Sequence, residues 1–112
     1  MLEILPVSDA HRCEALAARF SLPFYKGAIG YTAERDGHTV AFCQFECTDT
    51  GAILRSASQT PNAPPDLLRI LLIGVFAFCA AKNHLPIRAG DALPKETRAL
   101  LGALSENWQF LP

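Results

Sequence analysis

Residues 66–83, DLLRILLIGVFAFCAAKN, decide the fold of this chain. No residue from 70 to 81 carries a charged or strongly polar side chain, and Arg69 and Lys82 bound this run. A membrane-spanning helix needs about 20 apolar residues, and the run is much shorter. A helix that is apolar on every side is typical of a protein core. The stretch therefore predicts a soluble, central helix over residues 66–83, around which the other elements pack.

The two large aromatic side chains of this helix, Phe76 and Phe78, point to different sides of it. We expect a sheet to cover one side, and either the first helix of the chain or a second subunit to cover the other. Gly74 in mid-helix costs roughly 1 kcal/mol relative to alanine. We interpret it as a point where another backbone approaches closely.

Length and charge limit the range of functions. The chain has 112 residues, which suits one domain over residues 1–112. Ten Lys and Arg residues stand against eleven Asp and Glu residues, so no basic surface is expected for nucleic acid or a membrane. The N-terminal residues lack the basic and apolar regions of a signal peptide.

The four cysteines indicate a cytoplasmic protein without a metal site. None of them forms a C-x-x-C pair, and no histidine lies at zinc-finger spacing from them. They fall inside apolar segments, where a free cysteine behaves as a small hydrophobic residue. We predict reduced, buried thiols at four positions: Cys13, Cys43, Cys47 and Cys79.

Before the central helix, the pattern alternates strand, helix and a three-stranded meander. A strand over residues 2–7 contains Pro6, which places it at an edge of a sheet or late in the strand. Ser8 or Asp9 caps a helix that ends near residue 20, and residues 21–30 form a loop. Strands at 31–35 and 38–47 are joined by Asp36-Gly37, a strong signal for a type I′ hairpin turn. A third strand follows at 52–58.

After the central helix come a strand, a helix and a final strand. Asn83 is a plausible C-terminal cap, residues 85–89 read as a strand, and Pro94 opens a helix. The inward stripe of that helix is Thr97, Leu100, Leu101 and Leu104. Trp108 and Phe110 alternate in a terminal strand. The order β-α-β-β-β-α-β-α-β predicts an α+β sandwich with one mixed, mostly antiparallel sheet.

Three segments, taken in this order and at these separations, resemble the GNAT N-acetyltransferase superfamily. They are LEILPVSDAHRCEALAARF, GYTAERDGHTVAFCQFE and LLGALSENWQF. They are similar to the first strand and helix, the second and third strands, and the last helix and strand of that family. The resemblance implies the GNAT fold, with acetyl-CoA as the donor of an acetyl group.

The loop before the central helix departs from the family pattern. In GNAT proteins it carries Q/R-x-x-G-x-G/A, and its N–H groups hold the pyrophosphate of acetyl-CoA. The matching residues 62–67 are NAPPDL. Proline offers no N–H, and Asp66 adds a negative charge where an anion should sit. The resemblance places four cofactor-binding positions in or beside this degenerate loop: Ser58, Asn62, Ala63 and Arg69. We expect ordinary acetyl-CoA binding to be lost.

The resemblance also indicates two catalytic positions. Ser105 stands where many GNAT enzymes have a tyrosine that protonates the departing thiolate, and serine is too weak an acid for that role. Glu46, at the end of a central strand, is the candidate general base. The simpler interpretation of Glu46, which we favour, is a solvated strand end.

These observations leave three functional hypotheses. The first is a binding or assembly module, acting as a homodimer, that does not use acetyl-CoA in the usual way. The alternative is an active N-acyltransferase that moves an acetyl group from acetyl-CoA to an amine of a small molecule or protein. The third is a small-molecule or peptide binder that uses the strand edge beside residues 56–59.

Overall fold

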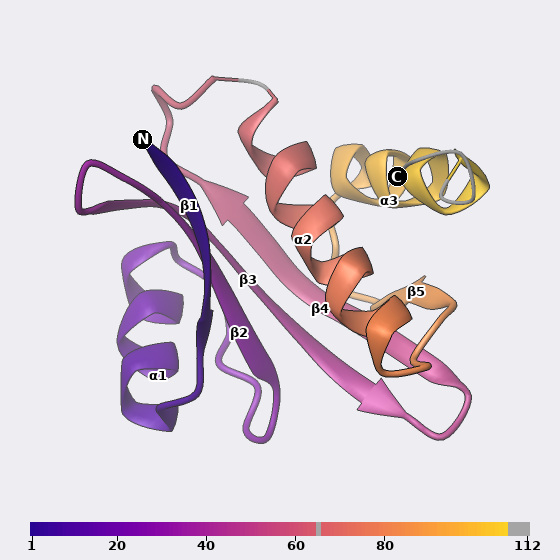
Figure 1. Cartoon of the computed structure of the whole chain (residues 1–112). Helices are drawn as coiled ribbons and strands as arrows, with labels where there is room; N and C mark the ends of the chain where they lie inside the picture. The colour runs from indigo at the N-terminus through magenta and orange to yellow at the C-terminus, as the bar shows by residue number, and fades with distance from the viewer. Residues whose placement is uncertain (65, 108–112) are drawn as a thin grey trace.

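The computed structural model describes residues 1–64 and 66–107 (Figure 1). The predicted order of elements is confirmed as far as the last helix. The terminal strand predicted around Trp108 and Phe110 lies outside the described residues. The elements are β1 (Leu2–Val7), α1 (Ala10–Arg19), β2 (Ile29–Arg35), β3 (His38–Thr48), β4 (Gly51–Gln59), α2 (Leu67–Ala81), β5 (Ile87–Ala89) and α3 (Lys95–Asn107).

The strands form one five-stranded sheet in the order β1-β2-β3-β4-β5. Neighbours from β1 to β4 are antiparallel, and β5 is parallel to β4. The predicted α+β fold with a mixed, mostly antiparallel sheet is therefore confirmed. β1 lies at one edge of the sheet, as the proline at position 6 indicates, since proline cannot donate a ladder hydrogen bond.

Several boundaries that were predicted from local signals are confirmed. Asp9 caps α1, and its carboxylate accepts a hydrogen bond from the His11 N–H at 2.9 Å. Asp36 and Gly37 take the positive φ angles of 52° and 82° that a type I′ turn needs. Asn83 ends α2 with a φ of 60°, and the next residue's N–H donates to the Cys79 carbonyl at 2.7 Å. This is the hydrogen-bond pattern of a Schellman motif.

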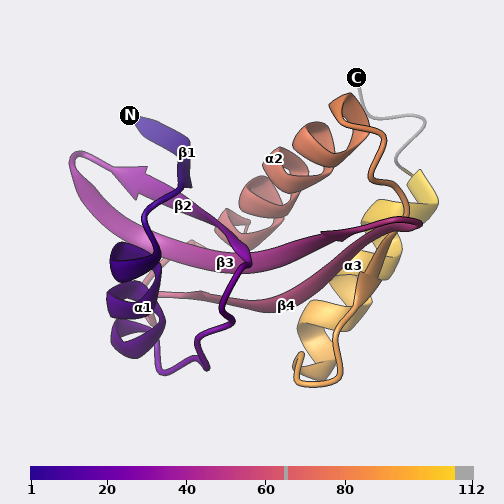
Figure 2. The ribbon, with the colours of Figure 1, turned by 90° about the horizontal axis from the view of Figure 1, so that it is seen from below.

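The helices lie on both sides of the sheet (Figure 2). α2 packs on β2, β3 and β4, where it forms the main core. α1 lies on the opposite side, over a smaller cluster built on Phe42. The expectation that α1 covers the far side of α2 is therefore wrong, because the two helices lie on opposite faces of the sheet. α3 packs beside β5 and contacts α2.

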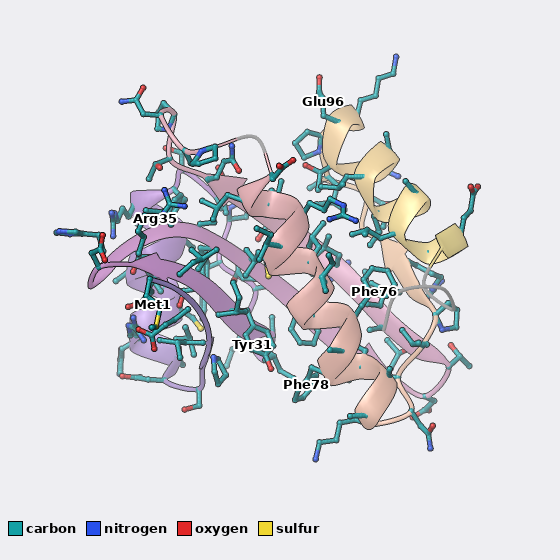
Figure 3. All side chains as sticks on the ribbon, turned by 45° about the horizontal axis from the view of Figure 1, so that its top comes forward. Met1, Tyr31, Arg35, Phe76, Phe78 and Glu96 are labelled. Carbon is teal, nitrogen blue, oxygen red and sulfur yellow. The ribbon has the colours of Figure 1, made fainter. Side chains whose placement is uncertain are left out.

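The two aromatic side chains of α2 do point to different sides of the helix (Figure 3). Phe78 meets the Tyr31 ring edge-on, with ring centroids 5.9 Å apart, and Phe45 at 5.7 Å. Phe76 is buried and directed towards α3. Apolar cover on both sides, as expected, thus comes from the sheet and from α3.

One face of α2 remains in contact with solvent. Ile70 is 38% exposed, and Ala77 and Ala81 are exposed as well. The prediction of a helix buried on every side is wrong within the chain, because this sheet and α3 surround only part of the helix. No helix in the described residues is long and apolar enough to cross a membrane.

The four cysteines are free thiols. Cys13, Cys43 and Cys79 are buried, as predicted. Burial raises the pKa of Cys43 to about 12. Cys47 is exposed, contrary to the prediction, and lies one residue before the end of β3.

Candidate functional site

The site begins where β4 and β5 separate. The two strands pair only over Ala52–Leu54 and Ile87–Ala89. The last link between them is the Gly90 N–H, which donates to the Leu54 carbonyl at 2.8 Å. A Cβ at position 90 would lie 2.8 Å from the same carbonyl oxygen, so only glycine allows this approach. Beyond this point β4 continues to Gln59 without β5 beside it.

A cleft of about 380 Å³ fills the space beside this free part of β4. The start of α2 and the start of α3 form its other walls. Its lining comprises Ala57, Ser58, Gln59, Leu68, Pro94, Glu96, Thr97 and Leu100. A second hollow of about 270 Å³ lies between the end of α1 and the end of β4, and Ser58 and Gln59 line both.

The free edge of β4 presents backbone hydrogen-bonding groups to the cleft. The Thr60 N–H donates to the Val40 carbonyl at 2.9 Å. Alternate residues of an antiparallel strand direct their N–H and C=O groups to opposite sides. The backbone groups of Ala57 and Gln59 therefore point away from β3, and both residues line the cleft.

A β-bulge interrupts β4 at the point of separation. Ser56 pairs with Gln44 and Leu54 pairs with Phe45, which leaves Arg55 as the extra residue. An Arg55 Nη2–H donates to Glu46 at 3.3 Å, and this hydrogen bond raises the pKa of Arg55.

The Arg55 guanidinium is held from two sides. It lies 5.8 Å from the centre of the Tyr25 ring, within cation–π range. Its Nε is buried and has no hydrogen-bond partner among the described residues. Glu46 is half-buried and orients Arg55. The interpretation that we favoured from the sequence was a solvated Glu46 at the end of the strand.

Gln44 holds the loop at residues 21–28 against the sheet. Its Nε2 donates to the Ser56 hydroxyl at 2.8 Å and to the Pro23 carbonyl at 2.8 Å. Its Oε1 accepts from the Tyr25 N–H at 3.0 Å. Sequence reasoning missed this residue, although a glutamine amid the apolar residues of a central strand is itself a signal.

The loop before α2 differs from a phosphate-binding loop in where its N–H groups point. The Leu67 N–H donates to the Pro64 carbonyl at 3.1 Å. The Leu68 N–H donates to Gln59 Oε1 at 3.2 Å. These two donors of the first turn therefore already have acceptors within the protein. Asp66 makes no side-chain cap, and its exposed carboxylate stands at the start of the helix.

The residues predicted for the site are not all brought together. Ser58 lines the cleft. Asn62 and Arg69 are exposed, and Ala63 packs partly against the core. Ser105 is exposed on the later part of α3, whereas the cleft is lined by Pro94 and by the earlier part of α3, up to Leu100. Within the described residues, no group of three or more His, Cys, Asp or Glu side chains could hold a metal ion.

Comparison with known proteins relates this architecture to acetyltransferases. No protein-family model matches the sequence, and no curated protein matches it. Solved structures do match. The aminoglycoside 6′-N-acetyltransferase AAC(6′)-Ih of Acinetobacter baumannii aligns with a TM-score of 0.68 and 16% identity, over 93% of this chain and 89% of the other.

Two further solved acetyltransferase structures align with this chain to a similar extent. The ribosomal-protein-alanine N-acetyltransferase of Brucella melitensis aligns with a TM-score of 0.65 and 13% identity, over 85% of this chain and 82% of the other. The aminoglycoside N-acetyltransferase AAC(6′)-Iy, solved in complex with CoA, aligns with a TM-score of 0.67 and 11% identity, over 95% of this chain and 86% of the other. The expected resemblance is confirmed at the level of architecture: this chain has the fold of the GNAT N-acetyltransferases.

Proposed function

We propose that this chain is a binding module with an acetyltransferase fold, whose cleft between β4 and α3 holds an extended peptide segment. One observation carries the proposal. The β4 edge offers free backbone groups at Ala57 and Gln59, while the Leu67 and Leu68 N–H groups at the start of α2 already have acceptors. The cleft can therefore recognise amides, and two of the donors that a pyrophosphate would require at the start of α2 are already occupied.

Charge near the cleft supports this choice of ligand. Glu96 lines the cleft at the start of α3 (Figure 3), and Asp66 stands at the start of α2. Carboxylates at two helix N-termini stabilise the helices themselves and repel an incoming phosphate. Of the nearby basic residues, Arg98 donates to the carbonyls of Leu93 and Gly90. A neutral amide chain meets none of this repulsion.

The walls of the cleft suit a strand that is added to a sheet edge. An extended peptide would pair with the free groups of β4, and alternate side chains would face Leu68 and Leu100. This is β-augmentation in a slot bounded by two helices. The four free cysteines suit the reducing cytoplasm, where we expect this binding to take place.

An active N-acyltransferase is the alternative, and a different observation favours it. The bulge at Arg55 lies at the point where β4 and β5 separate, so the inner end of the split contains an irregular backbone and a cation. The pantetheine arm of acetyl-CoA is itself an extended chain with two amides. It would use the same β4 edge as a peptide.

Binding of neutral and phosphorylated probes separates the two functions. We expect pantetheine and N-acetyl-tetraalanine amide, at millimolar concentration, to shift the backbone NMR signals of Ala57 and Gln59. Acetyl-CoA should produce no stronger response and no thermal stabilisation. Clear stabilisation by sub-millimolar acetyl-CoA would establish the acyltransferase alternative. No response to any of the three probes would exclude the cleft as a binding site.

A pair of tryptophan variants on α3 locates the binding. Leu100→Trp fills the cleft, whereas Ala99→Trp places the same side chain on the exposed side of the helix. We expect the first variant to abolish the NMR shifts and the second to keep them. Equal responses from both variants would place the ligand elsewhere.

A further inference from the structure

We propose that the hollow beside the end of α1 binds the C-terminal carboxylate of the peptide whose chain lies in the cleft. The proposal rests on the proposed function, and it adds which end of a peptide is recognised and in which direction the chain runs. The hollow has a volume of about 270 Å³ and shares Ser58 and Gln59 with the cleft. We call it the Arg19 hollow, after the one charged side chain among the described residues that line it.

Arg19 is held in place at the end of α1. Its Nη2–H donates to the Thr39 carbonyl at 3.0 Å, and its Cζ lies 5.4 Å from the centre of the Phe20 ring. Within residues 1–64 and 66–107 its other N–H groups have no acceptor, and it forms no ion pair. A guanidinium that is positioned in advance loses little freedom on binding, and its planar fork matches a carboxylate.

The rest of the lining supplies hydrogen-bond donors and no negative charge. Ser21, Ser58 and Thr60 carry hydroxyl groups that make no hydrogen bond within the described part of the chain. The Oε1 atom of Gln59 is already occupied, but its amide N–H groups stay available. No Asp or Glu is among the described residues that line the hollow, whereas Glu96 lines the cleft itself. An anion is therefore favoured in the hollow and not in the cleft.

Ser21 occupies a backbone position that ordinarily belongs to glycine. It follows α1 with a φ of 57°, and the Leu22 N–H donates to the Ala17 carbonyl at 2.8 Å, as in a Schellman motif. A side chain at this φ strains the backbone, and glycine would avoid the strain. The helix dipole favours any cation in the last turn of α1, but it gives no reason for a serine at position 21. A hydroxyl that binds a ligand does.

The position of the hollow sets the direction of the bound chain. β4 runs from Gly51 towards Gln59, and the hollow lies at that end, next to Thr60 and Pro61. A peptide parallel to β4 follows the line of β5, which is itself parallel to β4, and ends with its carboxylate beside Arg19. An antiparallel peptide would place its terminal ammonium there and be repelled. The cleft and the Arg19 hollow together select a free C-terminus.

Two peptides that differ only at the C-terminus test the proposal. N-acetyl-tetraalanine with a free carboxylate should bind about tenfold more tightly than its amide, measured from the NMR shifts of Ala57 and Gln59 at low salt. Arg19→Gln should abolish this difference and leave the affinity for the amide unchanged. Arg12→Gln removes the same charge from α1 at a position outside the hollow. It is the matched control and should retain the difference.

The outcomes separate the carboxylate site from the cleft. Equal affinity of both peptides for the wild-type chain would overturn the proposal and leave peptide binding in the cleft intact. A difference that survives in Arg19→Gln would also overturn it. No response to either peptide would overturn the proposed function together with the carboxylate site. Acetate alone should bind at least about tenfold more weakly than the peptide acid, and equal affinity would mean that the hollow takes any small carboxylate and not a chain end.

Ser21→Gly tests the hydroxyl group against the backbone that it strains. We expect the thermal midpoint to rise by about 2–4 °C, because glycine adopts this φ freely. The preference for the free carboxylate should fall about threefold, since one hydrogen-bond donor is lost. A more stable variant with an undiminished preference would overturn the assignment of this hydroxyl to the carboxylate site.

Discussion

At the scale of single residues, three polar side chains organise the site. Gln44 and Arg55 lie on neighbouring central strands, and each fixes a part of the loop at residues 21–28. Gln59 closes the start of α2 by accepting the Leu68 N–H. None of these three residues was among the predicted catalytic positions, although Glu46, which was, orients Arg55.

We expect Gln44→Ala to lower the free energy of unfolding by about 2–3 kcal/mol, because a buried residue with three hydrogen bonds is removed and its partners lose theirs. The control is Gln59→Ala, which removes one hydrogen bond at a half-exposed position and should cost about 1 kcal/mol. Urea unfolding with an unchanged m-value measures both. Equal costs would show that the Gln44 network contributes nothing beyond a single bond.

At the scale of elements, signals within a few residues predicted turns and helix ends well, whereas the contacts between elements were not predicted. The Asp36-Gly37 turn and the cap at Asn83 were correct because backbone φ preferences act within a few residues. The exposure of Ile70 was not predicted, because an apolar run reports only that a helix needs cover and not which element supplies it. The Gln44 network joins residues twelve to twenty-one positions apart, a separation that periodicity does not detect.

The contact between α2 and β1 can be tested at Gly74. Another backbone was expected here, and the structure shows a side chain, that of Ile4. Gly74→Ala gains about 1 kcal/mol of helix propensity, but its Cβ would meet the stiff, branched Ile4 at 2.9 Å. We expect Gly74→Ala to destabilise the wild-type chain and to stabilise the Ile4→Ala variant by about 1 kcal/mol. Urea unfolding measures the stabilities of the four proteins. The same sign in both backgrounds would disprove the steric account.

At the scale of the whole molecule, the separated strands β4 and β5 create a cleft, and the start of α2 forms a wall of it that does not suit a phosphate. The separation of β4 from β5 and the glycine at position 90 shape the slot. The start of α2, which faces the same slot, has proline, aspartate and an accepting glutamine where a phosphate would need free N–H groups. The shape of the cleft and its chemistry therefore point to different ligands. The sequence had indicated the strand edge beside residues 56–59 and the altered loop before α2, but not the other walls of the cleft.

This conflict predicts that phosphate affinity can be raised without changing the fold. The double variant Gln59→Ala/Asp66→Asn frees the Leu68 N–H and removes one negative charge from the start of α2. We expect acetyl-CoA to bind this variant on the order of tenfold more tightly than it binds the wild type, a difference of about 1.4 kcal/mol. Pantetheine, which has no phosphate, should bind both proteins equally. Isothermal titration calorimetry at low salt measures the four affinities. If acetyl-CoA and pantetheine gained equally, the cause would be a wider cleft, and if neither gained, the occupied N–H groups would not be what excludes the phosphate.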